Sequence, residues 1–154
     1  MTIFKGLMNF VYIDKHLWKI LGDHAKHEYP HECIGFFEAI HTVPGSIKIT
    51  NVFPGKNVIK PKNIRTMAAL LSKKDEKELL QLTRRNPDKI YGMFHSHPES
   101  GMTYLGEKDS FNAKIYKRFR NQIIVGVTHH GLRTKKAYWF WVKPLWTELQ
   151  IIVK

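Results

Sequence analysis

The spacing of apolar residues divides the first half of the chain into short strands and one helix. The apolar run at residues 10–13 predicts a strand, and Asp14 is a suitable N-cap for a helix that reaches about Lys26. Residues 34–40 and 46–53 are two further apolar runs separated by a Pro-Gly turn. Two such runs around a short turn predict a β-hairpin.

Strands and helices continue to follow one another in the second half. Strands are expected at residues 67–71, 89–94, 123–127 and 136–142. Helices are expected at residues 72–85, with Ser72 as the N-cap, and at residues 107–120, where apolar side chains recur every four positions. Because residues 123–127 are wholly apolar, we expect a central strand there, paired with residues 136–142 across a turn at His129-His130-Gly131.

Composition indicates one small globular domain over residues 1–154. The hydrophobic content of 43% over 154 residues is enough for one substantial core. No apolar run reaches the roughly 18 residues of a membrane span, and the first residues lack the apolar stretch and cleavage site of a signal peptide. A single cysteine excludes an internal disulfide framework, which is typical of a reducing compartment. We therefore expect a cytoplasmic protein without a membrane partner.

Two residues with reactive side chains are interpreted as packing residues. Cys33 lies inside an apolar run beside Ile34 and has no evident histidine partner, so a buried thiol is expected rather than a nucleophile. His24 shares a helix face with Leu17, Ile20 and Leu21, so it is expected to be half-buried rather than to bind a metal.

The sequence His95-Ser96-His97-Pro98, followed by Asp109, places three metal-ligand types in one short segment. Side chains alternate along a strand, so His95 and His97 at the end of the strand at residues 89–94 face the same side. Asp109 falls in the first turn of the helix expected at residues 107–120, where a carboxylate is favourable. Two imidazoles and one carboxylate match a catalytic zinc site, which keeps its fourth position for water.

A water activated by zinc needs a proton acceptor that is not itself a ligand. Glu32 is the candidate, because it stands at the polar start of the apolar run that leads to Gly35. We expect a hydrolase of amide bonds: zinc would lower the pKa of its water to roughly 7, Glu32 would take the proton, and hydroxide would attack the amide carbonyl carbon. The same carboxyl would then return the proton to the leaving amine.

Glu32 in an E-x-x-G strand, then the H-S-H-P sequence, then an aspartate that opens a helix, resembles the JAMM (MPN-plus, JAB-domain) zinc isopeptidases. The resemblance extends from about Val11 to Trp141 and includes the order of helices, strands and hairpin. It implies an α/β (α+β) fold of MPN/JAB type, similar to cytidine deaminases, with a mixed curved sheet flanked by helices. It also implies one zinc per chain on His95, His97 and Asp109, with Glu32 as general base.

The resemblance further implies a substrate and a cleft. The substrate would be a ubiquitin-like protein or its conjugates, cleaved after the C-terminal glycine in deconjugation or precursor processing. Small stand-alone members of the family are similar to proteins encoded in bacterial operons for ubiquitin-like conjugation or antiviral defence. Enzymes that activate and conjugate the ubiquitin-like protein are therefore expected partners. The cleft beside the zinc would be lined by Ser96, Pro98, Glu99, Met102 and Tyr104.

The chain departs from the family pattern at one position. Gly106 stands three residues before Asp109, where the family has a serine whose hydroxyl helps to stabilise the oxyanion, and the loop at residues 99–105 is one residue longer. Ser100 and Thr103 are the candidate replacement hydroxyls, with Ser110 as a third.

The formal net charge of +12 leaves the class of partner open. Positive residues gather at residues 56–74 and at residues 114–120, and such a surface steers an acidic protein or binds nucleic-acid phosphates. No helix-turn-helix, zinc-finger or RNP signature is present. We expect a zinc hydrolase of amide bonds. The alternatives are a noncatalytic MPN scaffold, a basic nucleic-acid-binding module and a metal hydrolase of a small amide.

Overall fold

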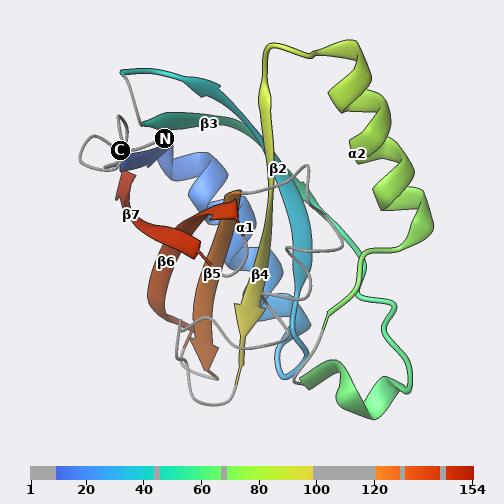
Figure 1. Ribbon diagram of the computed structural model, residues 1–154. Coiled ribbons are helices and arrows are strands. Elements are labelled where there is room, and N and C mark those ends of the chain that lie inside the picture. The colour runs from blue at the N-terminus through green and yellow to red at the C-terminus, as the bar shows by residue number, and fades with distance from the viewer. Residues whose placement is uncertain (1–9, 44–45, 67–68, 99–120, 129–130, 143–144) are drawn as a thin grey trace.

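The computed structural model describes residues 10–43, 46–66, 69–98, 121–128, 131–142 and 145–154. The strands are β1 (Phe10–Ile13), β2 (Ile34–His41), β3 (Ile47–Pro54), β4 (Ile90–His97), β5 (Asn121–Thr128), β6 (Gly131–Val142) and β7 (Leu145–Val153). The helices are α1 (Lys15–Glu28), the 3-10 helix η1 (Lys62–Thr66) and α2 (Lys73–Arg85). Figure 1 shows how these elements are arranged.

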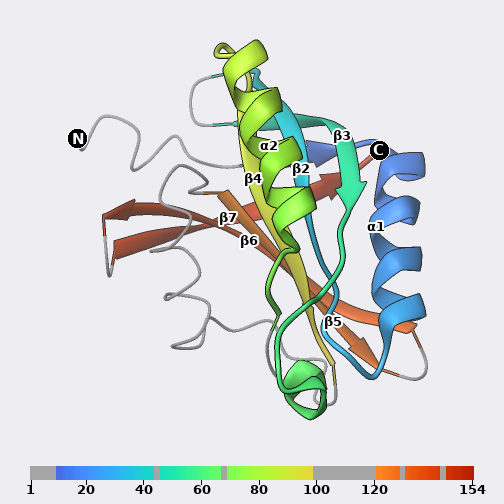
Figure 2. The same ribbon diagram turned by 90° about the vertical axis from the view of Figure 1, so that its right-hand side faces the viewer.

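The strands form one curled, mixed sheet that closes on itself in the order β1-β3-β2-β4-β5-β6-β7. Parallel pairs join β1 to β3, β1 to β7 and β4 to β5, whereas the remaining neighbours are antiparallel. Helices α1 and α2 lie on opposite faces of the strands β2 and β4 (Figure 2). The fold is therefore of the mixed α/β class, as expected.

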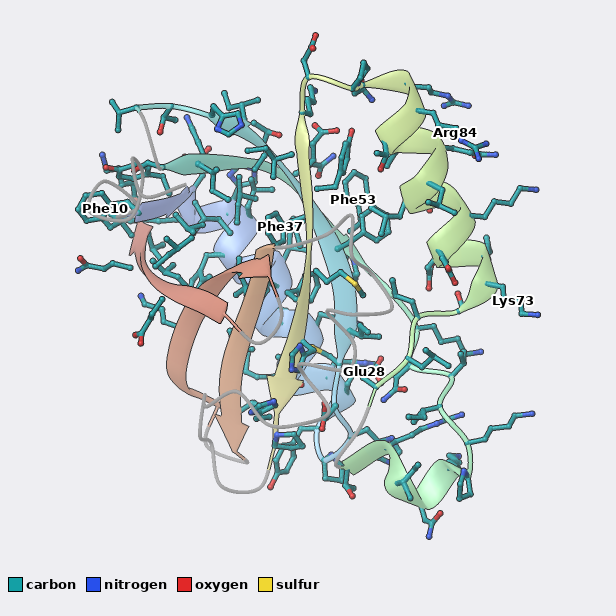
Figure 3. All side chains as sticks on the ribbon, in the orientation of Figure 1. Phe10, Glu28, Phe37, Phe53, Lys73 and Arg84 are labelled. Atoms are coloured by element: carbon teal, nitrogen blue, oxygen red, sulfur yellow. The ribbon has the colours of Figure 1, made fainter. Side chains whose placement is uncertain are left out.

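Alternating side chains of β2 and β4 contribute to two separate cores. Phe37 and Phe94 belong to the larger core, which α1 covers with Leu17 and Leu21. Side chains on the other face of the sheet pack against α2 in the smaller core: Ile34, Phe36, Ala69, Leu71, Leu79, Tyr91 and Met93. Figure 3 shows Phe37 and Phe53 on these two sides of β2. Each face of β2 and β4 is thus buried, which fixes their register.

The α-helices α1 and α2 begin at their expected caps. Asp14 occupies the N-cap of α1, and Ser72 caps α2 by accepting a hydrogen bond from the Asp75 amide at 3.1 Å. The hairpin of β2 and β3 and the antiparallel pair of β5 and β6 are also confirmed. No helix among the described residues is both long and apolar enough to span a membrane.

Two expectations differ from the structure. The strand expected at residues 67–71 is wrong for residues 69–71, where Leu71 forms only an isolated bridge to Asn57. This segment is an irregular connection that covers the core beside α2: Ala69 and Leu71 are buried there without forming a strand, whereas Leu70 is exposed. The strand β7 was not expected. The helix expected at residues 107–120 lies outside the described residues.

Candidate metal centre

The register between β2 and β4 brings Glu32 to the two histidines. Ile34 lies opposite His95, and Phe36 lies opposite Met93. Continuing this antiparallel register by two residues places Glu32 opposite His97. Because side chains alternate along a strand, Glu32, His95 and His97 then share the face of the sheet on which α2 packs. Residues far apart in sequence therefore meet where β2 begins and β4 ends.

The three side chains have the spacing that one metal ion requires. One ligand atom from each of Glu32, His95 and His97 lies within 4.8 Å of the other two. The Nε2 atoms of His95 and His97 are 3.1 Å apart. Two nitrogens bound to one tetrahedral zinc are about 3.3 Å apart, given Zn–N bonds of 2.0–2.1 Å. The imidazole pair therefore fits a shared zinc ion.

The site is shielded from solvent. Glu32 is 7% exposed and His95 is 4% exposed, whereas His97 is half-buried. A low local dielectric strengthens charge interactions, so a metal cation and a carboxylate interact more strongly here than at the surface. The half-buried His97 is the histidine more open to solvent.

Ser96 has a structural position between the two histidines. The Cys33 amide donates to Ser96 Oγ at 2.7 Å, and the Ser96 amide donates to the Cys33 carbonyl at 3.2 Å. Ser96 is fully buried, and its place in the expected cleft stays a prediction because the other cleft candidates on residues 99–104 lie outside the described residues. Its side chain faces opposite to His95 and His97 and continues the pairing of β2 with β4. Pro98 is also buried.

The segment between β3 and α2 holds the main chain of Glu32. The Glu32 amide donates to the Arg65 carbonyl at 2.6 Å, and the Asn57 side-chain amide donates to the Glu32 carbonyl at 3.0 Å. Asn57 Oδ1 in turn accepts from the amides of Ile59 and Leu70, at 3.2 Å each. Sequence reasoning missed Asn57 and Arg65, because nothing in their spacing from Glu32 marks them. Both residues hold Glu32 by hydrogen bonds to its backbone amide and carbonyl.

Close packing around Gly35 explains why the E-x-x-G pattern has a glycine at this position. A Cβ atom at this position would lie 2.4 Å from Cζ of Phe94 and 2.6 Å from the Phe53 carbonyl oxygen. Any larger residue would push β2 away from β4, and with it Glu32 from His95. His24 packs edge-on against Phe94, with Nε2 3.2 Å from the Ile34 carbonyl oxygen, which confirms its interpretation as a packing residue.

Cys33 is a packing residue of the larger core, as expected. It is fully buried, and burial raises the pKa of its thiol to about 12. At neutral pH the thiol therefore stays protonated. A protonated, enclosed thiol is not a nucleophile.

The remaining predicted site residues lie outside the described residues. These are the expected third ligand Asp109, the candidate hydroxyls Ser100, Thr103 and Ser110, the position Gly106, and the cleft candidates Glu99, Met102 and Tyr104. Among the described residues, Glu32 is the carboxylate that joins the two histidines. Glu32 has the position of a third ligand or of a base beside the metal.

Comparison with known proteins supports the fold. No family model matches the chain, and no curated protein matches it. Solved structures do match, among them the solution structure of protein DSY2949 from Desulfitobacterium hafniense. That structure has 17% sequence identity and a TM-score of 0.69, and the match covers 94% of this chain and 92% of that one. At this identity the likeness establishes a shared fold.

Proposed function

We propose that this chain is a zinc-dependent metalloprotease of JAMM (MPN-plus) type, with an MPN/JAB-type fold. Its reaction would be hydrolysis of the amide bond after the C-terminal glycine of a ubiquitin-like protein, in a conjugate or a precursor. The observation that carries the proposal is the convergence of Glu32, His95 and His97, whose ligand atoms lie within 4.8 Å of one another.

The donor set suits zinc better than magnesium or calcium. Imidazole nitrogen is a good ligand for zinc, whereas the harder cations prefer oxygen alone. His95 and His97 would hold the ion from one strand, and Asp109 is the proposed third ligand. The resemblance of the H-S-H-P sequence and of E-x-x-G to the family supports this assignment.

Bound zinc would supply Lewis-acid chemistry, because it lowers the pKa of water and polarises a carbonyl. Glu32 would do the proton transfer: its carboxylate accepts a proton from the attacking water and then donates it to the leaving amine. Its main chain is held by hydrogen bonds to Arg65 and Asn57, so the backbone that carries the carboxylate is fixed before a substrate arrives. The low exposure of Glu32 excludes most bulk water from this step.

Zinc content and hydrolysis test the assignment together. Wild-type protein should hold one zinc per chain by elemental analysis and should cleave a fluorogenic amide that ends in Gly-Gly. His97→Ala should lose most of the zinc, whereas His41→Ala, an exposed histidine at the far end of β2, should keep it. Glu32→Gln should keep the zinc and lose at least about a hundredfold in kcat, the scale expected for a general base.

Three results would contradict the proposal in different ways. Equal zinc content in wild type and His97→Ala would exclude a zinc site at His97. Loss of zinc from Glu32→Gln would make Glu32 a ligand instead of the base. A Glu32→Gln protein that hydrolyses at the wild-type rate, beside an exposed control such as Glu78→Gln, would exclude Glu32 from the chemistry.

A further inference from the structure

The segment that joins β3 to α2 is strongly basic. Residues 55–72 contain Lys56, Lys60, Lys62 and Arg65 and no aspartate or glutamate. The three lysines are exposed, and Arg65 is half-buried. The Lys56 amide donates to the Asp75 carboxylate at 2.9 Å, so a negative charge lies close to that residue. Among the described residues, no hydrogen bond joins Lys60, Lys62 or Arg65 to an aspartate or glutamate side chain.

Lys60, Lys62 and Arg65, here called the basic patch, lie close together. Lys62 and Arg65 are three residues apart in η1, and three residues make one turn of a 3-10 helix, so both lie on the same side. Arg65 Nε donates to the Ile59 carbonyl at 3.1 Å, which brings the guanidinium beside Lys60. The short backbone path thus concentrates three positive charges.

Within the described residues, Lys60, Lys62 and Arg65 form no ion pair. Lys19 and Lys26, in contrast, form ion pairs with Asp23, and Lys89 pairs with Glu38. Like charges held close together repel one another, and an acidic partner removes that repulsion.

The basic patch adjoins the candidate metal centre. The Arg65 carbonyl accepts the hydrogen bond of the Glu32 amide at 2.6 Å, so the residue that contributes a guanidinium to the patch also supports the proposed base. Figure 1 shows η1 at the end of the molecule where β4 ends and β2 begins. A chain bound on the basic patch would therefore lie beside the metal centre.

We propose that the basic patch binds an acidic segment of the protein substrate and so holds the scissile bond at the metal centre. The inference rests on the proposed function, because it names a feature of that substrate. Single-stranded nucleic acid fits less well, since its binding sites stack bases on aromatic side chains and residues 55–72 contain no phenylalanine, tyrosine or tryptophan. An acidic peptide needs only the charges.

Binding is tested without hydrolysis, by fluorescence anisotropy of labelled probes. The probes are a glutamate-rich peptide, its glutamine counterpart and a single-stranded oligonucleotide of matched charge. Lys60→Glu/Lys62→Glu is compared with Arg84→Glu/Arg85→Glu, which changes the net charge equally at exposed positions of α2. Figure 3 shows Arg84 at the end of α2 farther from η1 than Lys73. Lys60→Gln/Lys62→Gln provides a milder variant should the reversed one fold poorly.

The acidic peptide should bind wild type at low salt and should lose at least about fivefold in affinity in Lys60→Glu/Lys62→Glu, with a smaller loss in the glutamine variant. The Arg84→Glu/Arg85→Glu control should bind as wild type does. Equal losses in both reversed variants would overturn the proposal, because net charge alone would explain them. Tighter binding of the oligonucleotide, lost in the same variant, would also overturn it.

A second measurement separates this inference from the proposed function. Two fluorogenic amides ending in Gly-Gly differ only in four upstream residues, glutamate in one and glutamine in the other. Wild type should prefer the acidic amide in kcat/KM, and Lys60→Glu/Lys62→Glu should remove the preference without lowering kcat for the neutral amide. Hydrolysis of both amides without preference overturns the docking proposal. Binding of the acidic peptide with no hydrolysis of either amide contradicts the proposed function instead.

Discussion

The Cys33–Ser96 pair is the residue-scale contact on which the candidate metal centre depends. It lies between the Ile34–His95 pair and the point where Glu32 faces His97. The Ser96 hydroxyl accepts from the Cys33 amide, in place of the carbonyl that would do so in a regular ladder. A side chain inside the H-S-H-P sequence thus sets how closely β2 approaches the histidines.

Ser96→Ala should therefore lower the free energy of unfolding. The substitution leaves the buried Cys33 amide without its acceptor, which typically costs about 1–3 kcal/mol. Ser46→Ala is the matched control, because the Ser46 hydroxyl is buried and has no hydrogen-bond partner among the described residues. Urea unfolding followed by circular dichroism measures both.

The control should be neutral or slightly stabilising, since it removes an unpaired buried hydroxyl. Equal destabilisation in the two variants would show that Ser96 contributes only its volume. Zinc affinity gives a second measurement: Ser96→Ala should bind zinc more weakly than wild type, because the hydrogen bond orders the strand end that carries His95 and His97. Unchanged zinc affinity would contradict the structural role.

Part of the site was predictable from sequence at this scale, and part was not. The two-residue spacing of His95 and His97 places both on one face of any strand, which is a local property. The neighbouring position of Glu32 depends on the pairing of β2 with β4, which joins residues about sixty apart in sequence. The same alternation that places His95 and His97 on one face of β4 places Ser96 on the opposite face, where its hydroxyl accepts a hydrogen bond from the Cys33 amide.

At the scale of elements, a polar network on Glu38 joins three strands at the end of β2 and β4 away from the metal centre. Glu38 accepts hydrogen bonds from Tyr91 at 2.7 Å, from Lys89 at 3.0 Å and from Thr50 at 3.2 Å. Burial raises the pKa of Glu38, but these hydrogen bonds outweigh burial and hold the pKa below its ordinary value of 4.5. The ionised carboxylate therefore stabilises the folded state.

The network predicts a loss of stability in acid. A carboxylate whose pKa is lower in the folded state stabilises the protein above its unfolded pKa, and this contribution disappears as pH falls below about 4.5. Glu38→Gln should lower the free energy of unfolding at about pH 7 by about 1.5–3 kcal/mol, the scale of hydrogen bonds to a charged group. At about pH 3 the difference from wild type should be much smaller.

Denaturant unfolding at the two pH values measures this difference, with Glu78→Gln on the exposed face of α2 as the control. A Glu38→Gln deficit that is the same at both pH values would mean that shape, not charge, matters at this position. A loss of stability in Glu38→Gln that is larger at about pH 3 than at about pH 7 would contradict the lowered pKa of Glu38 in the folded state.

Local patterns predicted most elements of the described chain, but not those that depend on distant pairing. The caps at Asp14 and Ser72 and the two helices after them follow from short-range rules. The wrong strand at residues 69–71 has apolar side chains because it covers the core beside α2, and burial alone does not produce strand pairing. Strand β7 lacks a regular alternation, because Thr147 and Glu148 are adjacent polar residues and residues 151–153 are all apolar. It pairs with β6, its neighbour in sequence, and with β1, near the other end of the chain.

At the scale of the whole molecule, β1 closes the sheet. This four-residue strand pairs in parallel with β3 on one side and with β7 on the other. The pairing joins the first and last strands of the described chain, a contact that no local pattern encodes. Closure leaves the sheet without free edges, and β2 and β4 are flanked by β3 and β5, so the candidate metal centre lies on strands supported from both sides.

The net charge of +12 is also a property of the whole molecule, and it predicts a dependence on salt. If the positive field steers an acidic protein substrate, kcat/KM should fall severalfold between about 0.02 M and 0.5 M NaCl, because the Debye length shrinks well below about 10 Å. Under the proposed function the chemical step would take place beside the buried Glu32 and His95, so kcat should change little. Steady-state kinetics on a protein substrate or on the acidic fluorogenic amide measure both constants.

Charge variants then decide whether the field acts globally or through the basic patch. If the field acts globally, kcat/KM should depend less on salt in Lys60→Glu/Lys62→Glu and in Arg84→Glu/Arg85→Glu, and to the same extent in both. The reason is that both variants lose the same positive charge. A local patch predicts this weaker dependence only in the first, because screening leaves distant charges with little influence on a bound segment. We expect the second result. A kcat/KM independent of salt, together with tight and salt-sensitive binding to random duplex DNA, would instead identify the basic surface as a nucleic-acid interface.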